Sequence, residues 1–226
     1  MNAVLFCFLW QVAADPYAGA REAMVREQIA ARDVTDRAVI QVMRQVPRHE
    51  FVPPALRDQA YADHPLPIGH GQTISQPYIV ALMTQMLKLS PELRVLEIGA
   101  GSGYQAAVLS RLAAKVYTIE IVAPLAESAR QTLARLGYHN VEVRHGNGYL
   151  GWPEQAPFDR ILLTAAPREV PAALIEQLKP GGLLVAPVGA GPLSQELVTI
   201  EKTRDGKVRR RRGIPVRFVP MVSPPE

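Results

Sequence analysis

The sequence contains few of the residues on which disulfides, metal clusters and base-stacking surfaces depend. Cys7 is its one cysteine, so no disulfide can form within the chain and no cysteine-ligated metal site is expected. Aromatic residues make up 6% of the chain and do not alternate with basic ones, as a surface that stacks single-stranded nucleic acid would require. No run approaches the roughly 20 apolar residues that cross a bilayer. We therefore expect no metal, no nucleic acid and no membrane among its partners.

Length and composition predict a single globular unit. The chain has 226 residues, of which 48% are hydrophobic and 20% charged. These values are ordinary for a protein with one sizeable core, and the chain is short for two full domains. We expect one domain over residues 16–226, acting as a monomer, with an extension over residues 1–15 in front of it.

The extension has two interpretations. Residues 3–10 are apolar, and Val12, Ala13 and Ala14 resemble a signal-cleavage site. However, no basic residue precedes the apolar run, and the run is short for an export signal. We expect a disordered or loosely packed extension on a cytoplasmic protein. The alternative is a periplasmic protein whose first residues are a signal peptide.

Positive charge is concentrated near the carboxyl end of the sequence. The net charge is +4 and the pI is about 9.4, and residues 207–212 carry Lys207 and four consecutive arginines, Arg209–Arg212. The preceding pair, Asp205-Gly206, is typical of a hairpin turn. We expect a solvated hairpin strand here, and the alternative for such a basic run is a nucleic-acid surface.

The apolar pattern predicts helices first and then alternating strands and helices. Residues 16–46 fit two helices with Asp33, Thr35 and Asp36 between them, and a proline-rich connector over 47–67 leads toward a helix over 77–89. Strands are then expected at 94–98, 115–120, 140–144, 158–164 and 182–187, and helices at 104–113, 124–136 and 170–178.

This alternation is typical of an α/β protein with a doubly wound, Rossmann-like, mostly parallel sheet. Residues 196–202 and 208–219 predict an antiparallel pair that closes the sheet. The domain would thus comprise a helical N-terminal region (16–90), a core (91–190) and C-terminal strands (191–226).

The first predicted strand runs into a glycine-rich turn that contains Gly99, Gly101 and Gly103. Glycines allow a sharp turn and let a ligand approach the backbone without meeting a side chain. The spacing is Gly-x-Gly-x-Gly, whereas dinucleotide-binding folds have Gly-x-Gly-x-x-Gly. The turn therefore predicts a cofactor site at this end of the strand.

Two further signals follow the next two strands, where open α/β sheets bind ligands. Glu120 stands 17 residues after Gly103, and an acid there can accept hydrogen bonds from both hydroxyls of a ribose. Its alternative role is that of a surface acid. Asn147 and Gly148 follow the third strand, where the amide can hydrogen-bond an adenine edge or the pair can simply form a tight turn.

Four stretches together resemble the protein-L-isoaspartate O-methyltransferase family. They are residues 66–77 (LPIGHGQTISQP), 95–104 (VLEIGAGSGY), 158–167 (FDRILLTAAP) and 216–220 (VRFVP). The glycine turn is shared by many methyltransferases, whereas residues 72–77 and 216–220 are far more specific. The resemblance runs from about Tyr17 to Val222. It implies a methyltransferase Rossmann-like sheet with added N-terminal helices, S-adenosylmethionine as cofactor, and repair of damaged proteins by methylation of the free carboxylate of L-isoaspartyl residues.

The resemblance also implies residue roles in cofactor binding. Glu97 matches the acid that methyltransferases place near the amino-acid part of the cofactor, and Gly99, Gly101, Gly103, Glu120, Asn147 and Gly148 match the rest of its site. The family usually has aspartate where this chain has Asn147. An amide oxygen accepts a hydrogen bond without charge, so weaker cofactor binding is expected.

On the substrate side, Ser75 matches the family's active-site serine, whose hydroxyl would orient the carboxylate. Judged as a residue alone, Ser75 is equally suited to cap the helix that begins near Pro77. The matching segments imply substrate contacts at Leu66, Pro67, Ile68, Thr73, Val216 and Phe218.

Methylation of a carboxylate agrees with a sequence that contains few cysteines and histidines. A carboxylate is ionised at neutral pH and needs alignment with the methyl group more than it needs a base or a metal. The competing predictions are methylation of RNA or a small molecule, and a non-catalytic binding module. Against amino methylation, residues 164–167 read TAAP rather than an Asn/Asp-Pro-Pro-Tyr/Phe motif.

Overall fold

The computed structural model describes residues 15–191 and 194–223. The predicted disordered extension, its signal-peptide alternative and Cys7 lie outside these residues, apart from Asp15. Within the described ranges the helices are all too short or too polar to span a lipid bilayer.

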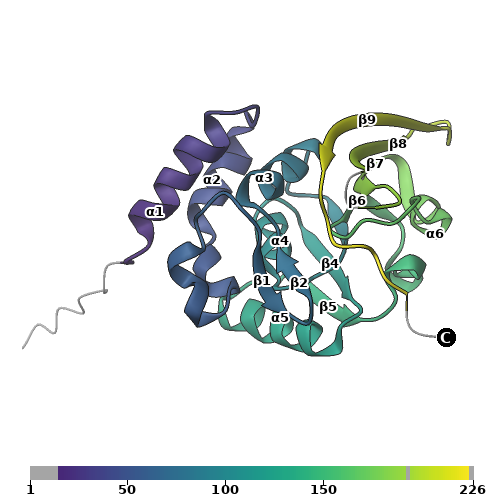
Figure 1. Cartoon of the computed structure of the whole chain (residues 1–226). Helices are drawn as coiled ribbons and strands as arrows, with labels where there is room; N and C mark the ends of the chain where they lie inside the picture. The colour runs from purple at the N-terminus through teal and green to yellow at the C-terminus, as the bar shows by residue number, and fades with distance from the viewer. Residues whose placement is uncertain (1–14, 192–193, 224–226) are drawn as a thin grey trace, which may run out of the picture.

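A seven-stranded sheet forms the centre of the molecule (Figure 1). Its order is β5-β4-β3-β6-β7-β8-β9. The strands are β3 (Arg94–Ile98), β4 (Lys115–Glu120), β5 (Val141–His145), β6 (Phe158–Leu163), β7 (Leu178–Val188), β8 (Gln195–Lys202) and β9 (Val208–Val216). Strands β3 to β7 are parallel, and β8 and β9 are added antiparallel. The predicted α/β fold with a closing antiparallel pair is confirmed.

The strands are buried because both faces of the sheet are covered. Side chains alternate between the faces of a strand, and in β3 Val95 joins one hydrophobic core while Leu96 and Ile98 join the other. The first core includes α3 (Pro77–Met86), α4 (Tyr104–Ser110) and the N-terminal helices. The second includes Leu174 of α6 (Ala172–Glu176).

Helix α5 (Ala123–Arg135) packs chiefly on β5 and β4. It ends before Gly137, which has a φ of +78°, the conformation that favours glycine after a helix. This confirms the predicted helix to within one residue at each end.

The N-terminal region contains the two predicted helices. Helix α1 (Ala18–Ala23) continues into a π-helical stretch (Met24–Ala30), and α2 (Arg37–Gln45) follows. The Asp36 carboxylate caps α2 by accepting hydrogen bonds from the backbone of Ala38 at 2.8 Å and Val39 at 3.3 Å. Asp36 therefore caps the start of this helix, as the sequence predicted.

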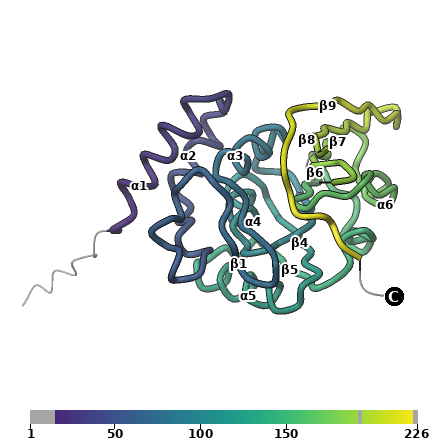
Figure 2. The backbone as a smooth tube through the Cα atoms, in the orientation of Figure 1, coloured from purple at the N-terminus to yellow at the C-terminus, as the bar shows by residue number. Residues whose placement is uncertain are grey.

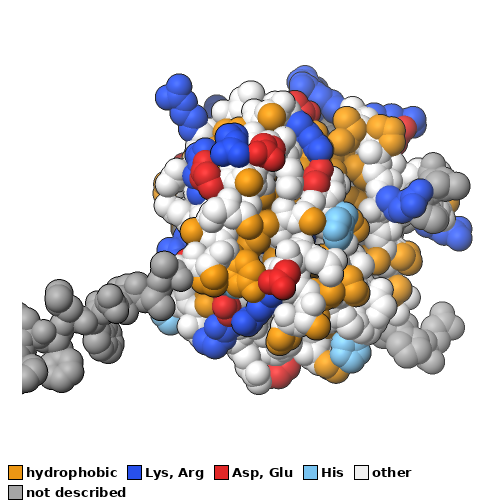
Figure 3. Space-filling view, turned by 60° about the vertical axis from the view of Figure 1, so that its left-hand side comes forward, with side chains coloured by type: hydrophobic (Ala, Val, Ile, Leu, Met, Phe, Trp, Pro, Cys, Tyr) orange, Lys and Arg blue, Asp and Glu red, His pale blue; other side chains and the backbone are white. Residues whose placement is uncertain are grey.

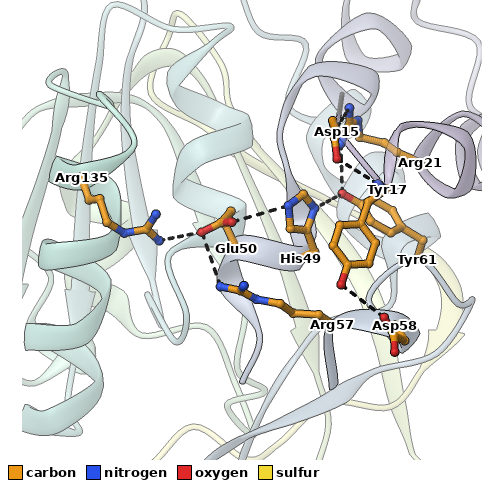
Figure 4. A network of polar contacts seen from close by, with 9 residues as sticks. All are labelled: Asp15, Tyr17, Arg21, His49, Glu50, Arg57, Asp58, Tyr61 and Arg135. Atoms are coloured by element: carbon orange, nitrogen blue, oxygen red, sulfur yellow. Dashed lines mark hydrogen bonds and ion pairs between the residues drawn. The ribbon is translucent and has the colours of Figure 1, made fainter. Parts of the chain in front are cut away.

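A group of polar contacts fastens this region to the core (Figure 4). The Glu50 carboxylate lies 2.9 Å from the Arg135 guanidinium of α5 and 3.7 Å from that of Arg57. On its other side is the His49 ring, which contacts the Tyr61 hydroxyl at 2.7 Å and stacks on Tyr17. Glu50 thus connects side chains of the N-terminal region to a helix of the sheet.

A short hairpin was not predicted. Strands β1 (Leu66–Gly69) and β2 (Gln72–Ile74) pair antiparallel where the sequence indicated only a proline-rich connector and a loop. Gly69, His70 and Gly71 all have positive φ, at +90°, +52° and +69°. The hairpin lies over the glycine turn, since a Cβ on Gly101 would stand 3.3 Å from the Ile68 side chain.

The chain leaves the sheet earlier than expected at its carboxyl end. The predicted strand over 208–219 is wrong in extent, because β9 ends at Val216. Residues 217–222, which we call the strap, instead cross toward the carboxyl ends of the parallel strands, as the yellow tube in Figure 2 shows. Strap residues bond to Ala166: its N–H donates to Val219 at 2.9 Å and its carbonyl accepts from Met221 at 2.8 Å.

Candidate active site

The glycine turn exposes bare backbone at the end of β3. Gly99, Gly101 and Gly103 have φ values of +101°, +52° and +88°, a region in which other residues are strained. A Cβ on Gly99 would stand 2.4 Å from the Thr164 hydroxyl oxygen. That hydroxyl already lies 2.6 Å from the Gly99 carbonyl oxygen. Glycine is thus required here by the neighbouring strand as well as by the turn.

Glu120 ends β4 beside this turn. One carboxylate oxygen accepts from the Gly101 N–H at 2.7 Å and the other from the Val122 N–H at 2.9 Å. The side chain is therefore fixed and 5% exposed. Each oxygen keeps a second lone pair, so the carboxylate can also accept from a ligand.

Asn147 and Gly148 have separate roles in the next loop. The Asn147 side-chain oxygen accepts from the Tyr149 N–H at 3.0 Å and thereby caps a short 3₁₀ turn over Gly148–Leu150. Gly148 lines a cleft beside Glu120, and a Cβ there would collide with Ile98 at 2.3 Å. The contact between Asn147 and adenine remains a prediction.

Glu97 lies beneath the turn, inside the sheet. It is 0% exposed, neither carboxyl oxygen has a hydrogen-bond partner within the described chain, and it lines none of the cavities described below. Burial raises the pKa of Glu97 to about 8, although the nearby Thr118 hydroxyl opposes the shift, and the charge of Glu120 adds to it. Its predicted contact with cofactor therefore stays a prediction.

Two connected hollows lie over the carboxyl ends of the strands. The narrow cleft has a volume of about 60 Å³ and is lined by Gly99, Gly101, Glu120, Gly148, Thr164 and Met221, among others. The large cavity, about 620 Å³, is lined by Ser75, Ile79, Gln195, Val216 and Phe218, among others. Thr73 and Thr164 line both.

Ser75 stands at the wall of the large cavity and also lines a smaller hollow over the glycine turn. Pro77 opens α3, and the N-cap position before it is held by Gln76, with no side-chain hydrogen bond to the helix. The alternative role of Ser75 as helix cap is therefore wrong. The helix does not use its hydroxyl.

The predicted substrate-contacting residues fall into two groups. Thr73, Val216 and Phe218 line the large cavity. Leu66, Pro67 and Ile68 form β1 and do not line it, although their neighbour Pro65 does. Leu66 is buried, whereas Pro67 is exposed.

Among the residues that had no predicted role, three shape the site. Thr164 joins the two hollows and fixes Gly99. Gln195, which is 4% exposed, accepts from the Phe218 N–H at 2.6 Å and donates to the Phe218 carbonyl at 3.1 Å. The Tyr149 hydroxyl donates to the Met221 carbonyl at 3.0 Å. Gln195 and Tyr149 thus hold the strap over the site.

Nearly the whole sequence matches one enzyme family. The sequence profile of protein-L-isoaspartate(D-aspartate) O-methyltransferase matches residues 19–226. The chain belongs to this family. A protein-L-isoaspartate O-methyltransferase of Synechococcus sp. is 58% identical over 216 residues, covering 93% of this chain and 88% of the relative. A protein-L-isoaspartate O-methyltransferase of Opitutus terrae is 59% identical over 200 residues, covering 88% of this chain and 85% of the relative.

Solved structures agree with the sequence comparison. A protein-L-isoaspartate O-methyltransferase structure matches with a TM-score of 0.79 and 30% identity, over 90% of this chain and 66% of the other. This chain therefore spans slightly less than two thirds of that protein. A Plasmodium falciparum protein, provisionally assigned to the same enzyme class, was solved in complex with S-adenosyl-L-homocysteine. It matches with a TM-score of 0.77 and 25% identity, over 89% of this chain and 98% of the other.

Family membership confirms the predicted activity. The chain is an S-adenosylmethionine-dependent protein-L-isoaspartate O-methyltransferase, an enzyme of protein repair. The alternative of a methyltransferase for RNA or small molecules is not supported, and neither is a non-catalytic module.

Proposed function

We propose that the narrow cleft holds S-adenosylmethionine, that the large cavity holds the isoaspartyl peptide, and that the two meet at the wall formed by Thr73, Ser75 and Thr164. The observation that carries this arrangement is the sharing of Thr73 and Thr164 by both hollows, with Ser75 beside them. Reacting groups brought together in this way need no further encounter in solution.

The chain's own groups fit the cofactor in chemistry. The Glu120 carboxylate keeps lone pairs for ribose hydroxyls, and the backbone at Gly99, Gly101 and Gly148 carries no side chain that would obstruct a nucleoside. When bound, S-adenosylmethionine supplies an electrophilic methyl group on a sulfonium. Further predicted contacts from Glu97, Gly103 and Asn147 belong to the same proposal.

The strap forms one wall of the narrow cleft, because its residues 219–222 line it. The cleft is open to solvent beside this wall. We therefore expect the strap to cover part of the bound cofactor.

Ser75 acts in this proposal by orienting the substrate carboxylate. That carboxylate has an ordinary pKa of about 3.5 to 4 and is ionised at neutral pH, so no base has to remove a proton from it. The Ser75 hydroxyl would donate a hydrogen bond to one oxygen and direct the other toward the methyl group. Thr73 stands on the same wall. Leu66, Pro67 and Ile68 on one side and Val216 and Phe218 on the other would hold the peptide backbone.

Substitutions of Ser75 test this role. Ser75→Ala should lower kcat on an isoaspartyl peptide by roughly 100-fold, the effect of misplacing a reacting atom by about 1 Å, with little change in cofactor affinity or melting temperature. Ser75→Thr should keep part of the activity because it keeps a hydroxyl. Ser75→Asp should be inactive but stable, because it places a second carboxylate against the substrate. Exposed Ser128→Ala on α5 is the control.

An active and stable Ser75→Asp enzyme would contradict the orienting role. Rates would be measured by methyl transfer to an isoaspartyl peptide and to its aspartyl twin. Cofactor affinity would be measured by calorimetry.

The broader organisation is also proposed. One hydrophobic core reaches from Met24 in the N-terminal region to Leu197 in β8, which supports residues 16–226 as one domain. We expect this domain to act as a monomer in the cytoplasm without nucleic acid, with the periplasm as the alternative if residues 1–14 are an export signal. Sedimentation and cell fractionation test these points.

A further inference from the structure

Strand β9 is the outermost strand of the sheet and is exposed along nearly its whole length. Among the strands that the structure describes, it pairs with β8 alone. Residues 208–215 are exposed, including those on both faces of the strand. An edge strand presents a row of unpaired N–H and C=O groups to which another extended chain can add.

This edge carries charge of one sign. Four consecutive residues of β9, Arg209–Arg212, are arginines, and Arg217 follows in the strap. Neighbouring β8 carries two glutamates, Glu196 and Glu201, and one lysine, Lys202. Among the described residues, Arg212 is the one of the five arginines with an ion pair, to Glu196 at 3.8 Å, and its side chain is 78% exposed. Most of the positive charge is therefore available to a partner.

The face over the N-terminal helices differs from this edge. There, basic and acidic side chains lie intermixed, as the blue and red atoms in the upper part of Figure 3 show. Arg26 pairs with Glu27 at 2.5 Å, and Arg44 pairs with Glu22 at 3.0 Å. A surface of mixed sign gives no comparable preference for an anionic partner.

The basic edge leads directly into the substrate cavity. Pro215 and Val216 at the end of β9, and Arg217 after it, line the large cavity beside Ser75. At about 3.3 Å per residue, Arg212 stands roughly 13 Å and Arg209 roughly 23 Å along the strand from Val216. A peptide whose isoaspartyl residue lies at Ser75 would need a flank of about four to seven extended residues to reach them.

We propose that the open edge of β9 is a docking surface for acidic, extended segments that flank the isoaspartyl residue of a substrate. The inference rests on the proposed placement of the substrate in the large cavity. The flanking chain pairs with the free backbone of β9, and its Asp and Glu side chains face the arginines on either face. The enzyme thereby favours damage within acidic, unfolded stretches over the same damage in neutral or basic ones.

The test uses peptides that differ only in their flank. Each has the same isoaspartyl centre, with a glutamate-rich, glutamine-rich or lysine-rich extension on one side or the other, and an unextended peptide is the reference. We expect kcat/KM relative to the reference to be about tenfold higher for the glutamate-rich flank than for the glutamine-rich one, and lowest for the lysine-rich one. This order should fade at about 0.5 M salt, where exposed charges are screened.

Cancelling the net charge of the strand should weaken the order. Alternate residues lie on opposite faces, so R209E/R211E and R210E/R212E each alter one face. Both should lose most of the preference for the glutamate-rich flank, while R209K/R211K should keep the wild-type order. The arginines could instead serve only to prevent the edge strands of two molecules from pairing. Glutamates would do this equally well, so under that explanation the substitutions would leave the flank order unchanged. R26E/R37E, on the helical face, is the control with equal change in charge.

An identical flank order in wild type and both reversed variants would overturn the proposal. A second result would also overturn it: the flanks have no effect, and the wild type binds RNA in a salt-dependent way that both variants lose. The arginines would then bind nucleic acid. Fluorescence anisotropy of the same peptides gives the order of binding without turnover. Absence of methylation of the unextended peptide would instead count against the proposed function.

Discussion

Glu97 places an acid in the centre of the sheet. Its carboxyl is fully buried without a hydrogen-bond partner of good geometry in the described chain, and the hydroxyl of Thr118, its partner residue on β4, also has none. Burial raises its pKa from an ordinary 4.5 to about 8. The folded protein therefore holds this proton more tightly than the unfolded chain does. The resulting stabilisation is complete below about pH 4.5 and is lost as the pH rises to about 8.

Glu97→Gln should remove this pH dependence. The amide has nearly the same shape and carries no charge, so the melting temperature of the variant relative to wild type should rise between pH 5 and pH 8.5. We expect a rise of at least about 2 °C, the shift that about 1 kcal/mol gives in a protein of this size. Thermal unfolding at both pH values measures it, with exposed Glu127→Gln as the control.

If the melting temperatures of the variant and the wild type differed equally at both pH values, Glu97 would not hold a proton in the folded state. Calorimetry on the same variant separates this structural effect from a contact with the cofactor. Such a contact would weaken cofactor binding at both pH values.

Single residues were predictable where their signal is local. The glycine turn and Glu120 stand at strand ends that the apolar pattern predicts, and the structure brings them together around one cleft. Thr164 and Gln195 could not be found in this way. Their partners Gly99 and Phe218 lie 65 and 23 positions away along the chain, and nothing in the local sequence indicates those pairings.

At the scale of elements, the order and type of the strands and helices from β3 to β8 were predictable, and buried parallel strands such as β3 and β6 have nearly continuous apolar runs. Bounds were less so: β7 begins at Leu178, four residues before the predicted start. The β1–β2 hairpin was missed because it is short and contains Pro67, a residue that usually argues against a strand. The end of β9 was missed for another reason. Residues 217–219 read as an extension of the strand, but bonds from Gln195 and Ala166 direct them into the strap.

Gln195→Ala should loosen the strap. It removes two hydrogen bonds to Phe218, each worth about 0.5 to 1.5 kcal/mol, and the strap lines both hollows. We expect roughly a tenfold loss of kcat/KM for an isoaspartyl peptide, mainly through a higher KM, and weaker cofactor binding. Steady-state kinetics and calorimetry measure the two effects.

Gln177→Ala is a matched control. Gln177 accepts from the Trp152 N–H and donates to the Leu150 carbonyl, both at 2.8 Å, so its loss removes the same kinds of bond from a loop outside both hollows. If the two variants lowered the melting temperature and raised the KM equally, Gln195 would have no specific role in positioning the strap.

At the scale of the molecule, the N-terminal region and the sheet are joined by a shared hydrophobic core and by Glu50. The Glu50 carboxylate is about one-fifth exposed and lies between three cationic or protonatable groups, those of Arg135, Arg57 and His49. The region could be predicted as helical from its sequence. Its attachment to α5 could not, because the contact of Glu50 with Arg135 joins distant parts of the chain.

Glu50→Gln should therefore destabilise the whole protein. Removing the charge leaves the guanidinium groups of Arg135 and Arg57 without their partner, and we expect a loss of about 1 kcal/mol at low salt. In a protein of this size the melting temperature should fall by about 2–4 °C, with a smaller effect at about 0.5 M salt.

Glu22→Gln provides the comparison for Glu50. Glu22 pairs with Arg44 at 3.0 Å within the N-terminal region, so its loss breaks an ion pair without touching the junction with α5. If the two substitutions lowered the melting temperature equally, the ion pairs of Glu50 would contribute no more than an ordinary surface ion pair.

We expect the strap to dock late in folding. Its anchors are Tyr149 after β5, Ala166 after β6 and Gln195 at the start of β8, so it can make all its bonds only when these distant parts of the chain have come together. Contacts between distant parts of a chain form slowly because closing long loops costs entropy. A refolding chain would thus acquire its helices and sheet while it is still inert, and catalysis would return only when the strap has docked.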